Sequence, residues 1–252
     1  MTHPTARPWD GKGFKAIICD LDGVVTDTAA VHAAAWKSLF DGVLRARAAR
    51  EGTPFVPFTE QDYLQHVDGR PRYDGVRTFL ASRGITLPEG TPDDGPDEQT
   101  VCGLGNRKNL EFNAIIERDG ATRFDGAVEL IRRLRAEGLR AVVVSSSKNC
   151  GPVLASAGLS DLFEAQVDGI YATEKGLPGK PAPDTFIEGA RLVGIAPAAC
   201  IMVEDAISGV QAGRDGGFGL VIGIDRGAGT DDLRDNGAHV VVKDLGDFLG
   251  DD

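Results

Sequence analysis

Long hydrophobic runs are missing from this chain of 252 residues. No run approaches the roughly 18 apolar residues that a membrane-spanning helix needs, and residues 1–13 lack the apolar core of a signal peptide. We therefore expect a cytoplasmic protein that has no membrane partner. Residues 1–13, which are polar and contain proline and glycine, are expected to form a disordered tail.

The chain has few cysteines, and its basic residues are fewer than its acidic residues. Cys19, Cys102, Cys150 and Cys200 are widely spaced without a CxxC pair, which favours reduced, mostly buried thiols over disulfides or a zinc site. Lys and Arg number 27 against 38 Asp and Glu, so the formal net charge is −11. This charge argues against nucleic acid or an anionic membrane as a partner. A small anionic substrate is compatible with it if a few Lys and Arg converge locally.

The most informative stretch that is present is KAIICDLDGVVTDT, residues 15–28. Its apolar run Ala16 to Cys19 predicts a buried parallel strand, and Asp20, Asp22 and Gly23 follow at the strand end. Open α/β sheets bind ligands at the carboxyl ends of their strands, so both carboxylates can face one crevice. An ordinary Asp-Gly turn after a strand is the alternative interpretation.

The remainder of the chain changes its pattern once. Helices without strand periodicity are expected first, over 29–51, 60–67, 73–83 and 106–118, with an acidic, solvated loop over 87–99. Helices at 125–137, 152–157, 185–193 and 207–214 then alternate with strands at 139–144, 165–168, 200–203, 220–224 and 239–242. This alternation predicts an α/β fold with a Rossmann-like parallel sheet. Residues 14–29 and 118–252 would form this core, and 30–117 an inserted small helical cap.

Further polar side chains follow other predicted strands. Ser145 ends one strand, Glu204 and Asp205 end another, and Lys180 lies on a loop between them. Carboxylates from separate strand ends can hold Mg²⁺, a hydroxyl and backbone N–H groups suit a phosphoryl group, and a lysine can neutralise its charge. Taken singly, these are a helix cap, a solvated loop and a surface lysine. Their joint occurrence in one sheet favours a phosphoryl-transfer site.

The order DLDGVVTDT, Ser145, Lys180, Glu204-Asp205 resembles the four motifs of the haloacid dehalogenase (HAD) superfamily over residues 14–224. The resemblance implies a HAD core with a cap, Asp20 as nucleophile and Asp22 as general acid and base. Asp22 is typical of the phosphatase and phosphomutase branch. The resemblance also implies Mg²⁺ held by the Asp20 carboxylate, the Asp22 main-chain carbonyl and Asp205, with Glu204 nearby. Ser145 and Lys180 would orient and neutralise the transferred group.

Within this branch both the cap and the core resemble the β-phosphoglucomutase family. The matching segments are His32 with Ala35-Trp36-Lys37, the turn Gly69 to Arg72, Arg107-Lys108-Asn109, Ser145 to Asn149, and KPAPD from Lys180. The implied substrate-binding residues are Thr28, His32, Trp36, Gly69, Arg70, Arg72, Lys108, Ser146, Ser147, Lys148 and Asn149. From spacing alone, ordinary packing would explain the i,i+4 pair His32 and Trp36. Two features depart from the family: the turn is unusually basic, and an acidic insertion lies near 88–100.

The resemblance implies a monomeric enzyme acting on a small phosphorylated sugar. It would interconvert β-glucose 1-phosphate and glucose 6-phosphate through an aspartyl phosphate and glucose 1,6-bisphosphate. Arg72 would grip the non-reacting phosphate, while His32 and Lys108 would contact sugar or phosphate. A phosphatase with water as the acceptor is the alternative, and a non-catalytic sugar-phosphate binding protein is a third hypothesis.

Overall fold

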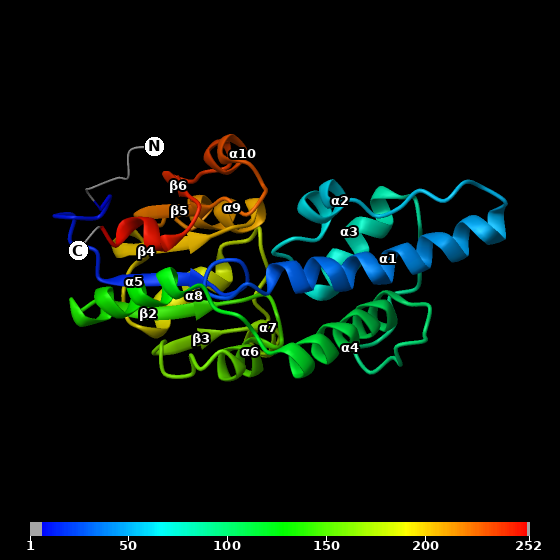
Figure 1. Ribbon diagram of the computed structural model, residues 1–252, viewed down its shortest axis with the longest axis horizontal. Coiled ribbons are helices and arrows are strands. Elements are labelled where there is room, and N and C mark those ends of the chain that lie inside the picture. Colours follow the sequence, from blue (N-terminus) through cyan, green and yellow to red (C-terminus); the bar gives the residue numbers. More distant parts are fainter. Residues whose placement is uncertain (1–6, 251–252) are drawn as a thin grey trace. The chain divides into compact units, whose positions relative to one another are not determined.

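The computed structural model describes residues 7–250, and the chain divides into two compact units. The first, here called the core unit, consists of Met1–Asp27 and Ala121–Asp252. The second, here called the helical unit, is Thr28–Gly120, inserted after the first strand of the core unit. Figure 1 labels most of the helices and strands of both.

A sheet of six parallel strands organises the core unit, in the order β3-β2-β1-β4-β5-β6 (Figure 1). The strands are β1 (Ala16–Asp20), β2 (Arg140–Val144), β3 (Ala165–Val167), β4 (Cys200–Glu204), β5 (Leu220–Ile224) and β6 (Val240–Val242). Strand β1 pairs with β2 on one side and β4 on the other, so the strand order reverses there. Ligand sites of open α/β sheets lie at the carboxyl ends of the strands at such a switch point. The predicted α/β fold with a parallel sheet is confirmed.

Helices cover the sheet of the core unit. They are α5 (Asp125–Ala136), α6 (Cys150–Ser156), α7 (Gly169–Lys175), α8 (Asp184–Leu192), α9 (Ile207–Asp215) and α10 (Thr230–Asp235), with short 3-10 turns η1 (Pro197–Ala199) and η2 (Leu245–Phe248). Phe186 of α8 and Val210 of α9 pack in one apolar cluster with Ile18 of β1. The sequence did not predict α7. It forms because the Asp168 carboxylate accepts hydrogen bonds from the N–H groups of Ile170 and Tyr171. Helix α10 was also missed, because it is too short to show a helical period.

Four helices build the helical unit: α1 (Ala29–Glu51), α2 (Glu60–His66), α3 (Arg72–Ser82) and α4 (Val101–Asp119). Its core is aromatic. The Phe40 ring centroid lies 4.1 Å from that of Phe79 and 5.2 Å from those of Phe58 and Trp36. Such rings contribute large buried areas together with orientation-dependent contacts, and they join α1 to α3 and to the segment before α2.

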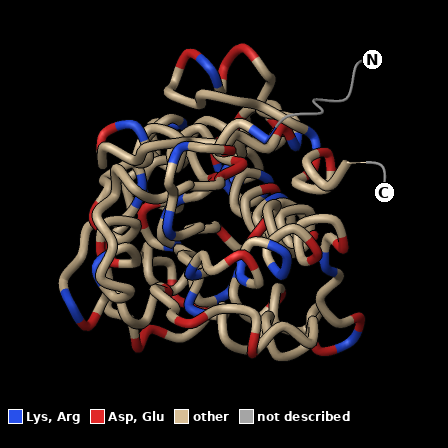
Figure 2. Tube along the Cα trace, turned by 90° about the vertical axis from the view of Figure 1, so that its left-hand side faces the viewer, with Lys and Arg blue, Asp and Glu red and all other residues tan. Residues whose placement is uncertain are grey.

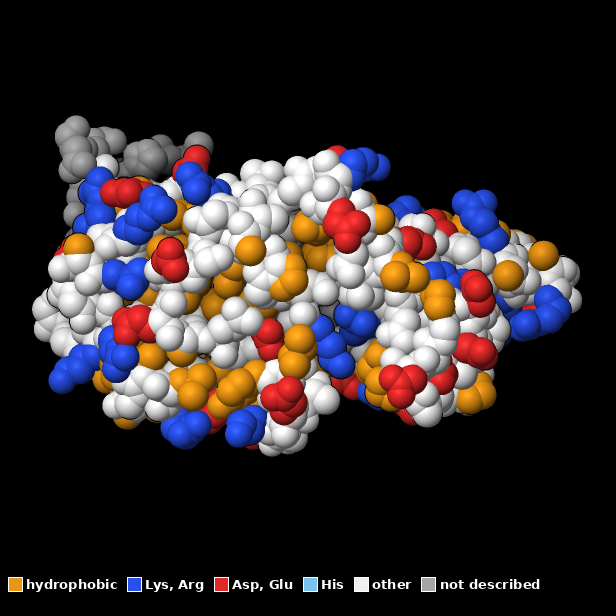
Figure 3. Space-filling view, turned by 90° about the horizontal axis from the view of Figure 1, so that it is seen from below, with side chains coloured by type: hydrophobic (Ala, Val, Ile, Leu, Met, Phe, Trp, Pro, Cys, Tyr) orange, Lys and Arg blue, Asp and Glu red, His pale blue; other side chains and the backbone are white. Residues whose placement is uncertain are grey.

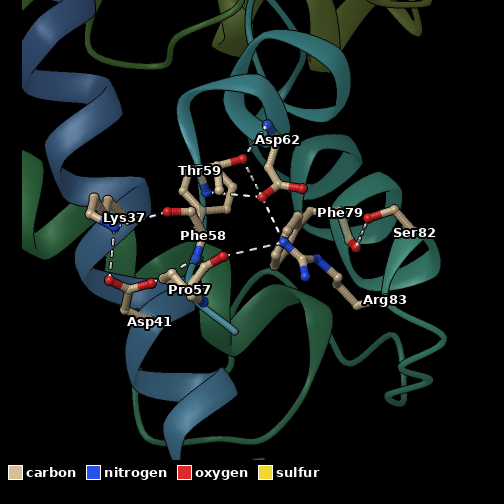
Figure 4. A network of polar contacts seen from close by, with 9 residues as sticks. All are labelled: Lys37, Asp41, Pro57, Phe58, Thr59, Asp62, Phe79, Ser82 and Arg83. Atoms are coloured by element: carbon tan, nitrogen blue, oxygen red, sulfur yellow. Dashed lines mark hydrogen bonds and ion pairs between the residues drawn. The ribbon is translucent and has the colours of Figure 1, made fainter. Parts of the chain in front are cut away.

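Polar contacts fix the connection between α1 and α2 (Figure 4). The Asp41 carboxylate accepts a hydrogen bond of 2.8 Å from the Phe58 N–H. Thr59 and Asp62 form a reciprocal capping box at the start of α2. Arg83, just after α3, donates to Asp62 over 2.6 Å. The end of the connection that leads into α2 therefore has defined partners.

Helix α4 begins earlier than the sequence predicts, at Val101 rather than near 106. The Thr100 hydroxyl accepts from the Gly103 N–H over 2.9 Å and caps the helix. The first turns of the helix contain Gly103 and Gly105, which have low intrinsic helix propensity. Gly105 is required by packing, since a Cβ at this position would lie 2.7 Å from Tyr73 Cδ1.

The acidic loop before α4 is more than a solvated connection. The Asn106 side-chain amide donates to the carbonyls of Pro92 and Asp94, at 3.0 and 2.9 Å. Arg107 Nε donates to the Pro96 carbonyl over 2.7 Å. The loop is thus fastened to the first turns of α4, which composition alone could not show.

The expected disordered tail is only partly within the described residues, because residues 1–6 lie outside them. Residues 7–13 differ from the expectation. Trp9 is buried with its ring centroid 4.9 Å from that of Phe248, and Arg7 pairs with Glu137 over 2.8 Å. One aromatic side chain is enough to dock this short segment.

All four cysteines are free and buried, and burial raises the pKa of the Cys200 thiol to about 11. No helix within residues 7–250 is both long and apolar enough to span a membrane. Figure 2 shows basic and acidic residues interspersed along the trace, and the face in Figure 3 carries side chains of both charges.

Candidate active site

Lys180 joins two carboxylates inside the core unit. Its Nζ donates to Asp20 Oδ1 and to Glu204 Oε1, and none of the three residues is more than 4% exposed. Burial acts to lower the pKa of Lys180, but the two carboxylates outweigh it and hold the pKa above its usual value. Lys180 is therefore a buried ammonium group rather than a surface lysine.

Asp20, Glu204 and Asp205 bring carboxylate oxygens within 4.8 Å of one another. Burial raises the pKa of Asp20 well above its usual value; the Lys180 ammonium opposes this, and Glu204 and Asp22 reinforce it. One ammonium among several buried carboxylates leaves an excess of negative charge. These hard oxygen donors fit a divalent cation such as Mg²⁺.

Both carboxylate oxygens of Glu204 accept hydrogen bonds from the protein. Glu204 Oε1 is held by Lys180, and Glu204 Oε2 accepts from the N–H groups of Asp205 and Ala206 at 2.7 and 3.2 Å. Glu204 thus has protein donors on both oxygens. Glu204 thereby positions Lys180 beside Asp20.

The chain after β1 makes a tight turn that carries Asp22. The Gly23 N–H donates to the Thr26 carbonyl over 2.7 Å, and the Leu21 carbonyl accepts from Val25 and Thr26, both at 2.9 Å. Gly23 has a φ of +85°, and a Cβ there would lie 1.8 Å from Asp205 Oδ2. Only glycine fits this position, because both the left-handed backbone and the approach of Asp205 exclude a side chain.

A second turn follows β2 and meets the first. Ser145 Oγ donates to Asp22 Oδ2 over 3.2 Å and accepts from the Ser147 N–H over 3.1 Å. Ser147 Oγ accepts in turn from the Asn149 N–H, at 3.1 Å. The serines do not cap α6, whose N-cap is Asn149 without a side-chain cap bond. They stabilise a turn that also includes Ser146 and Lys148. The Gly169 N–H donates to the Ser147 carbonyl over 3.0 Å and joins this turn to the start of α7.

In the helical unit, a lysine lies among aromatic rings. Lys108 is 3% exposed; its Nζ contacts His32 Nδ1 and lies 5.1 Å from the Trp36 ring centroid and 4.8 Å from that of Phe112. The His32 ring stacks on Phe112 with centroids 4.1 Å apart. Trp36 also belongs to the apolar core, so ordinary packing explains part of the His32 and Trp36 spacing. The faces of these rings attract the cationic end of a lysine.

Arg72 begins α3 and is held by neutral groups. Arg72 Nη2 donates to Asn109 Oδ1 over 2.6 Å, and Nη1 lies 3.5 Å from Asn106 Oδ1. Burial lowers the pKa of Arg72, with Tyr73 opposing this effect. Among residues 7–250 no carboxylate forms an ion pair with Arg72. Its charge therefore lacks a counterion from these residues.

The other predicted substrate-binding residues of this unit lie at helix starts and turns. Thr28 is the buried N-cap residue of α1, and its carbonyl accepts from the His32 N–H over 2.9 Å. Gly69, with a φ of +70°, and Arg70, whose N–H donates to the Val67 carbonyl over 3.1 Å, form the turn before α3.

Sequence reasoning missed Asn106 and Phe112. Asn106 links Arg72 to the acidic loop, and Phe112 supports both His32 and Lys108. Helical spacing gave one usable signal, since Phe112 follows Lys108 by four residues and must share its face. Nothing local to the sequence connects Asn106 to Arg72.

Comparisons with known proteins agree with this arrangement. The haloacid dehalogenase-like hydrolase model matches residues 14–217. The chain is 48% identical to "Beta-phosphoglucomutase" of Mycobacterium tuberculosis, over 93% of this chain and 91% of that protein. It is 39% identical to an "Uncharacterized glycosyl hydrolase" of the same species, over 94% of this chain but only 18% of that protein. A solved β-phosphoglucomutase from Clostridium difficile has the same fold, with 24% identity, a TM-score of 0.71 and 92% of each chain covered. The chain belongs to the haloacid dehalogenase-like hydrolase family.

Proposed function

We propose that this enzyme is a Mg²⁺-dependent β-phosphoglucomutase. It would interconvert β-glucose 1-phosphate and glucose 6-phosphate through an aspartyl phosphate and glucose 1,6-bisphosphate. The observation that carries this proposal is the 48% identity to a protein of that name, which extends over 93% of the chain and so includes the helical unit. Substrate preference in this fold depends on such added units, whereas the sheet alone supports many functions.

Asp20 is the proposed nucleophile. An Asp20 carboxylate oxygen attacks phosphorus, the new O–P bond forms, and the bond from phosphorus to the sugar oxygen breaks. The Lys180 ammonium, in contact with Asp20, reduces the repulsion between the attacking carboxylate and the phosphoryl oxygens. A bound Mg²⁺, held by Asp20, Asp205 and the Asp22 main-chain carbonyl, would supply further positive charge at the phosphoryl group.

Asp22 is the proposed general acid and base. It gives its proton to the departing sugar oxygen and later takes a proton from the sugar hydroxyl that attacks the phosphorylated Asp20. The hydrogen bond from Ser145 Oγ to Asp22 Oδ2, 3.2 Å long, orients the carboxyl group. This dual role requires a carboxyl that can hold a proton at working pH, so the pKa of Asp22 is expected above that of a free aspartate.

In the helical unit, Arg72 is the proposed ligand of the phosphate that does not react. Its guanidinium is oriented by Asn106 and Asn109, which leave its positive charge uncompensated. Arginine binds phosphate through paired N–H donors, and preorganisation lowers the entropic cost. His32 and Lys108 are the proposed contacts for sugar or phosphate in the helical unit. Ser146, Ser147, Lys148 and Asn149 are the proposed substrate contacts in the core unit.

A sugar-phosphate phosphatase is the second candidate, favoured by the hydrolase family to which the chain belongs. The same Asp20 and Asp22 would act, with water instead of a sugar hydroxyl attacking the aspartyl phosphate. A non-catalytic sugar-phosphate binding protein would need no proton donor at Asp22.

A paired assay separates these functions. Purified protein with Mg²⁺ and β-glucose 1-phosphate is primed with glucose 1,6-bisphosphate, and glucose 6-phosphate and inorganic phosphate are measured in parallel. Glucose 6-phosphate formed with little free phosphate supports the mutase. Mainly free phosphate overturns it in favour of the phosphatase, and substrate binding without either product indicates the binding protein. Asp20→Asn is the matched negative control.

A further inference from the structure

Arg226 reaches the turn that carries Asp22 from a distant part of the chain. It lies two residues after β5, yet its Nε donates to the Gly23 carbonyl over 2.8 Å. Gly23 directly follows Asp22. No motif in the sequence draws attention to this arginine, and the proposed mechanism does not use it.

The guanidinium of Arg226 is held on two further sides. Its central carbon lies 3.8 Å from the centroid of the Phe124 ring, and Nη2 pairs with Asp244 Oδ2 over 3.5 Å. Phe124 is itself tied to the Asp22 turn, since its N–H donates to the Val25 carbonyl over 2.9 Å. The planar guanidinium of Arg226 thus contacts two segments of the core unit: Gly23, just before the inserted helical unit in the sequence, and Phe124, just after it.

The backbone that presents Arg226 is also fixed. Asp225 accepts hydrogen bonds from the N–H groups of Gly227 and Gly229, both at 3.1 Å, and from Lys243 Nζ at 2.8 Å. The pKa of Asp225 is lowered to about 2, first by the hydrogen bond from Lys243. Asp225 therefore stays ionised and keeps the loop closed around its carboxylate at neutral pH.

The Asp22 turn needs an external support of this kind. Within the turn, the Leu21 carbonyl accepts from Val25 and Thr26, and the Thr26 carbonyl accepts from the Gly23 N–H. The donor to the Gly23 carbonyl, Arg226, comes from outside the turn. The Gly23 carbonyl is separated from Asp22 only by the Gly23 Cα and one peptide bond, so a change in the Gly23 backbone would shift Asp22 relative to Asp20 and Ser145. Displacement of a reacting group by about 1 Å can cost a factor of about 100 in rate.

We propose that Arg226 is a positioning residue, which fixes the Asp22 carboxyl group for proton donation by holding the Gly23 carbonyl and stacking on Phe124. This inference rests on the proposed role of Asp22 as general acid. In the affected step, the O–P bond to Asp20 forms, the bond to the leaving oxygen breaks, and the Asp22 proton moves to that oxygen.

Leaving groups provide the test. The variants Arg226→Gln, Arg226→Lys and Asp22→Asn are compared with the wild type using glucose 1,6-bisphosphate and p-nitrophenyl phosphate as phosphoryl donors. A sugar oxygen needs a proton to leave, whereas nitrophenolate leaves without one. Arg226→Gln should slow phosphorylation of the enzyme by glucose 1,6-bisphosphate about 10- to 100-fold. It should slow phosphorylation by p-nitrophenyl phosphate less than about twofold, because only the sugar oxygen needs a proton to leave. Arg226→Lys, which keeps the charge and one donor but not the planar stack, should recover part of the loss.

Two controls make the result decisive. Arg234→Ala removes an exposed arginine of α10 from the same region and should change neither rate. Asp22→Asn should show the same selectivity as Arg226→Gln, only larger.

The inference is wrong if Arg226→Gln slows the reactions with both donors equally, or slows neither, while Asp22→Asn remains selective. If Asp22→Asn is not selective, the proposed function fails first. If Arg226→Gln does not fold, Phe124→Leu, which removes the ring beneath the guanidinium, is measured against the same criterion.

Discussion

The two units treat their buried positive charges in opposite ways. In the core unit Lys180 contacts two carboxylates, and each of the three groups depends on the others. In the helical unit Arg72 is held by amide oxygens and Lys108 lies over aromatic rings. The amide oxygens orient the Arg72 guanidinium without neutralising it, so its charge stays available for an anion. This difference supports the proposal that the core unit holds the reacting group and a metal ion and that the helical unit binds a phosphate.

The largest effect is expected where charges are paired. Lys180→Met would leave Asp20 and Glu204 as buried carboxylates without their ammonium partner. We expect the free energy of unfolding to fall by about 3–5 kcal/mol and the rate of turnover by about 10³-fold. Urea unfolding and the paired assay measure the two effects.

The control for this variant is Lys175→Met, which removes an exposed lysine of α7. Mg²⁺ should restore part of the stability lost in Lys180→Met, because a second cation can replace the missing charge between the carboxylates. Unchanged stability in Lys180→Met would contradict the interdependence of these three groups.

A smaller and different effect is expected in the helical unit. Arg72→Gln should lower kcat/KM for β-glucose 1-phosphate about 100-fold, since a charge-assisted contact to phosphate is lost. Its free energy of unfolding should change by less than about 1 kcal/mol, because no buried carboxylate loses a partner. Arg77→Gln on the same helix, where the arginine pairs with Asp74 and Glu89, is the control and should leave kcat/KM unchanged. A large loss of stability with Arg72→Gln would remove the contrast between the units.

The smallest effect concerns a charge pair of the core unit away from Lys180. The pKa of Asp225 is lowered to about 2, so its contribution to stability is present above the unfolded value near 4 and is lost as the pH falls towards 2. Asp225→Asn should therefore cost about 1 kcal/mol at pH 7, since Lys243 is 74% exposed and the pair is partly screened. The difference from the wild type should shrink from pH 5 to pH 3 in urea unfolding. A difference independent of pH would show that charge is not the cause.

The sequence predicts the parts of the molecule that depend on local pattern. The apolar run before Asp20 and the alternation after Phe124 were sufficient for the parallel sheet, because buried strands need continuous apolar segments. The predicted start of α4 near residue 106 was wrong: the helix begins at Val101, and the close approach of Tyr73 requires a glycine at position 105.

Contacts between distant residues lie beyond such patterns. Asn106 and Arg72 are 34 positions apart, and Arg226 and Gly23 are 203 apart. Polar residues of this kind have no periodicity that could mark them. The residues proposed to contact a ligand directly were found through motifs, whereas those that orient them, such as Asn106 and Arg226, become visible only when the chain is folded.

The aromatic residues have a practical consequence. The chain has two tryptophans, and the core unit and the helical unit contain one each. Trp9 lies against Phe248, and Trp36 lies 5.1 Å from the ammonium of Lys108. Each unit therefore has its own intrinsic fluorophore. In a Trp9→Phe background, the emission reports on the surroundings of Lys108, and a ligand that moves this ammonium changes it. The Trp36→Phe protein supplies the matching signal from the other unit, without any added dye.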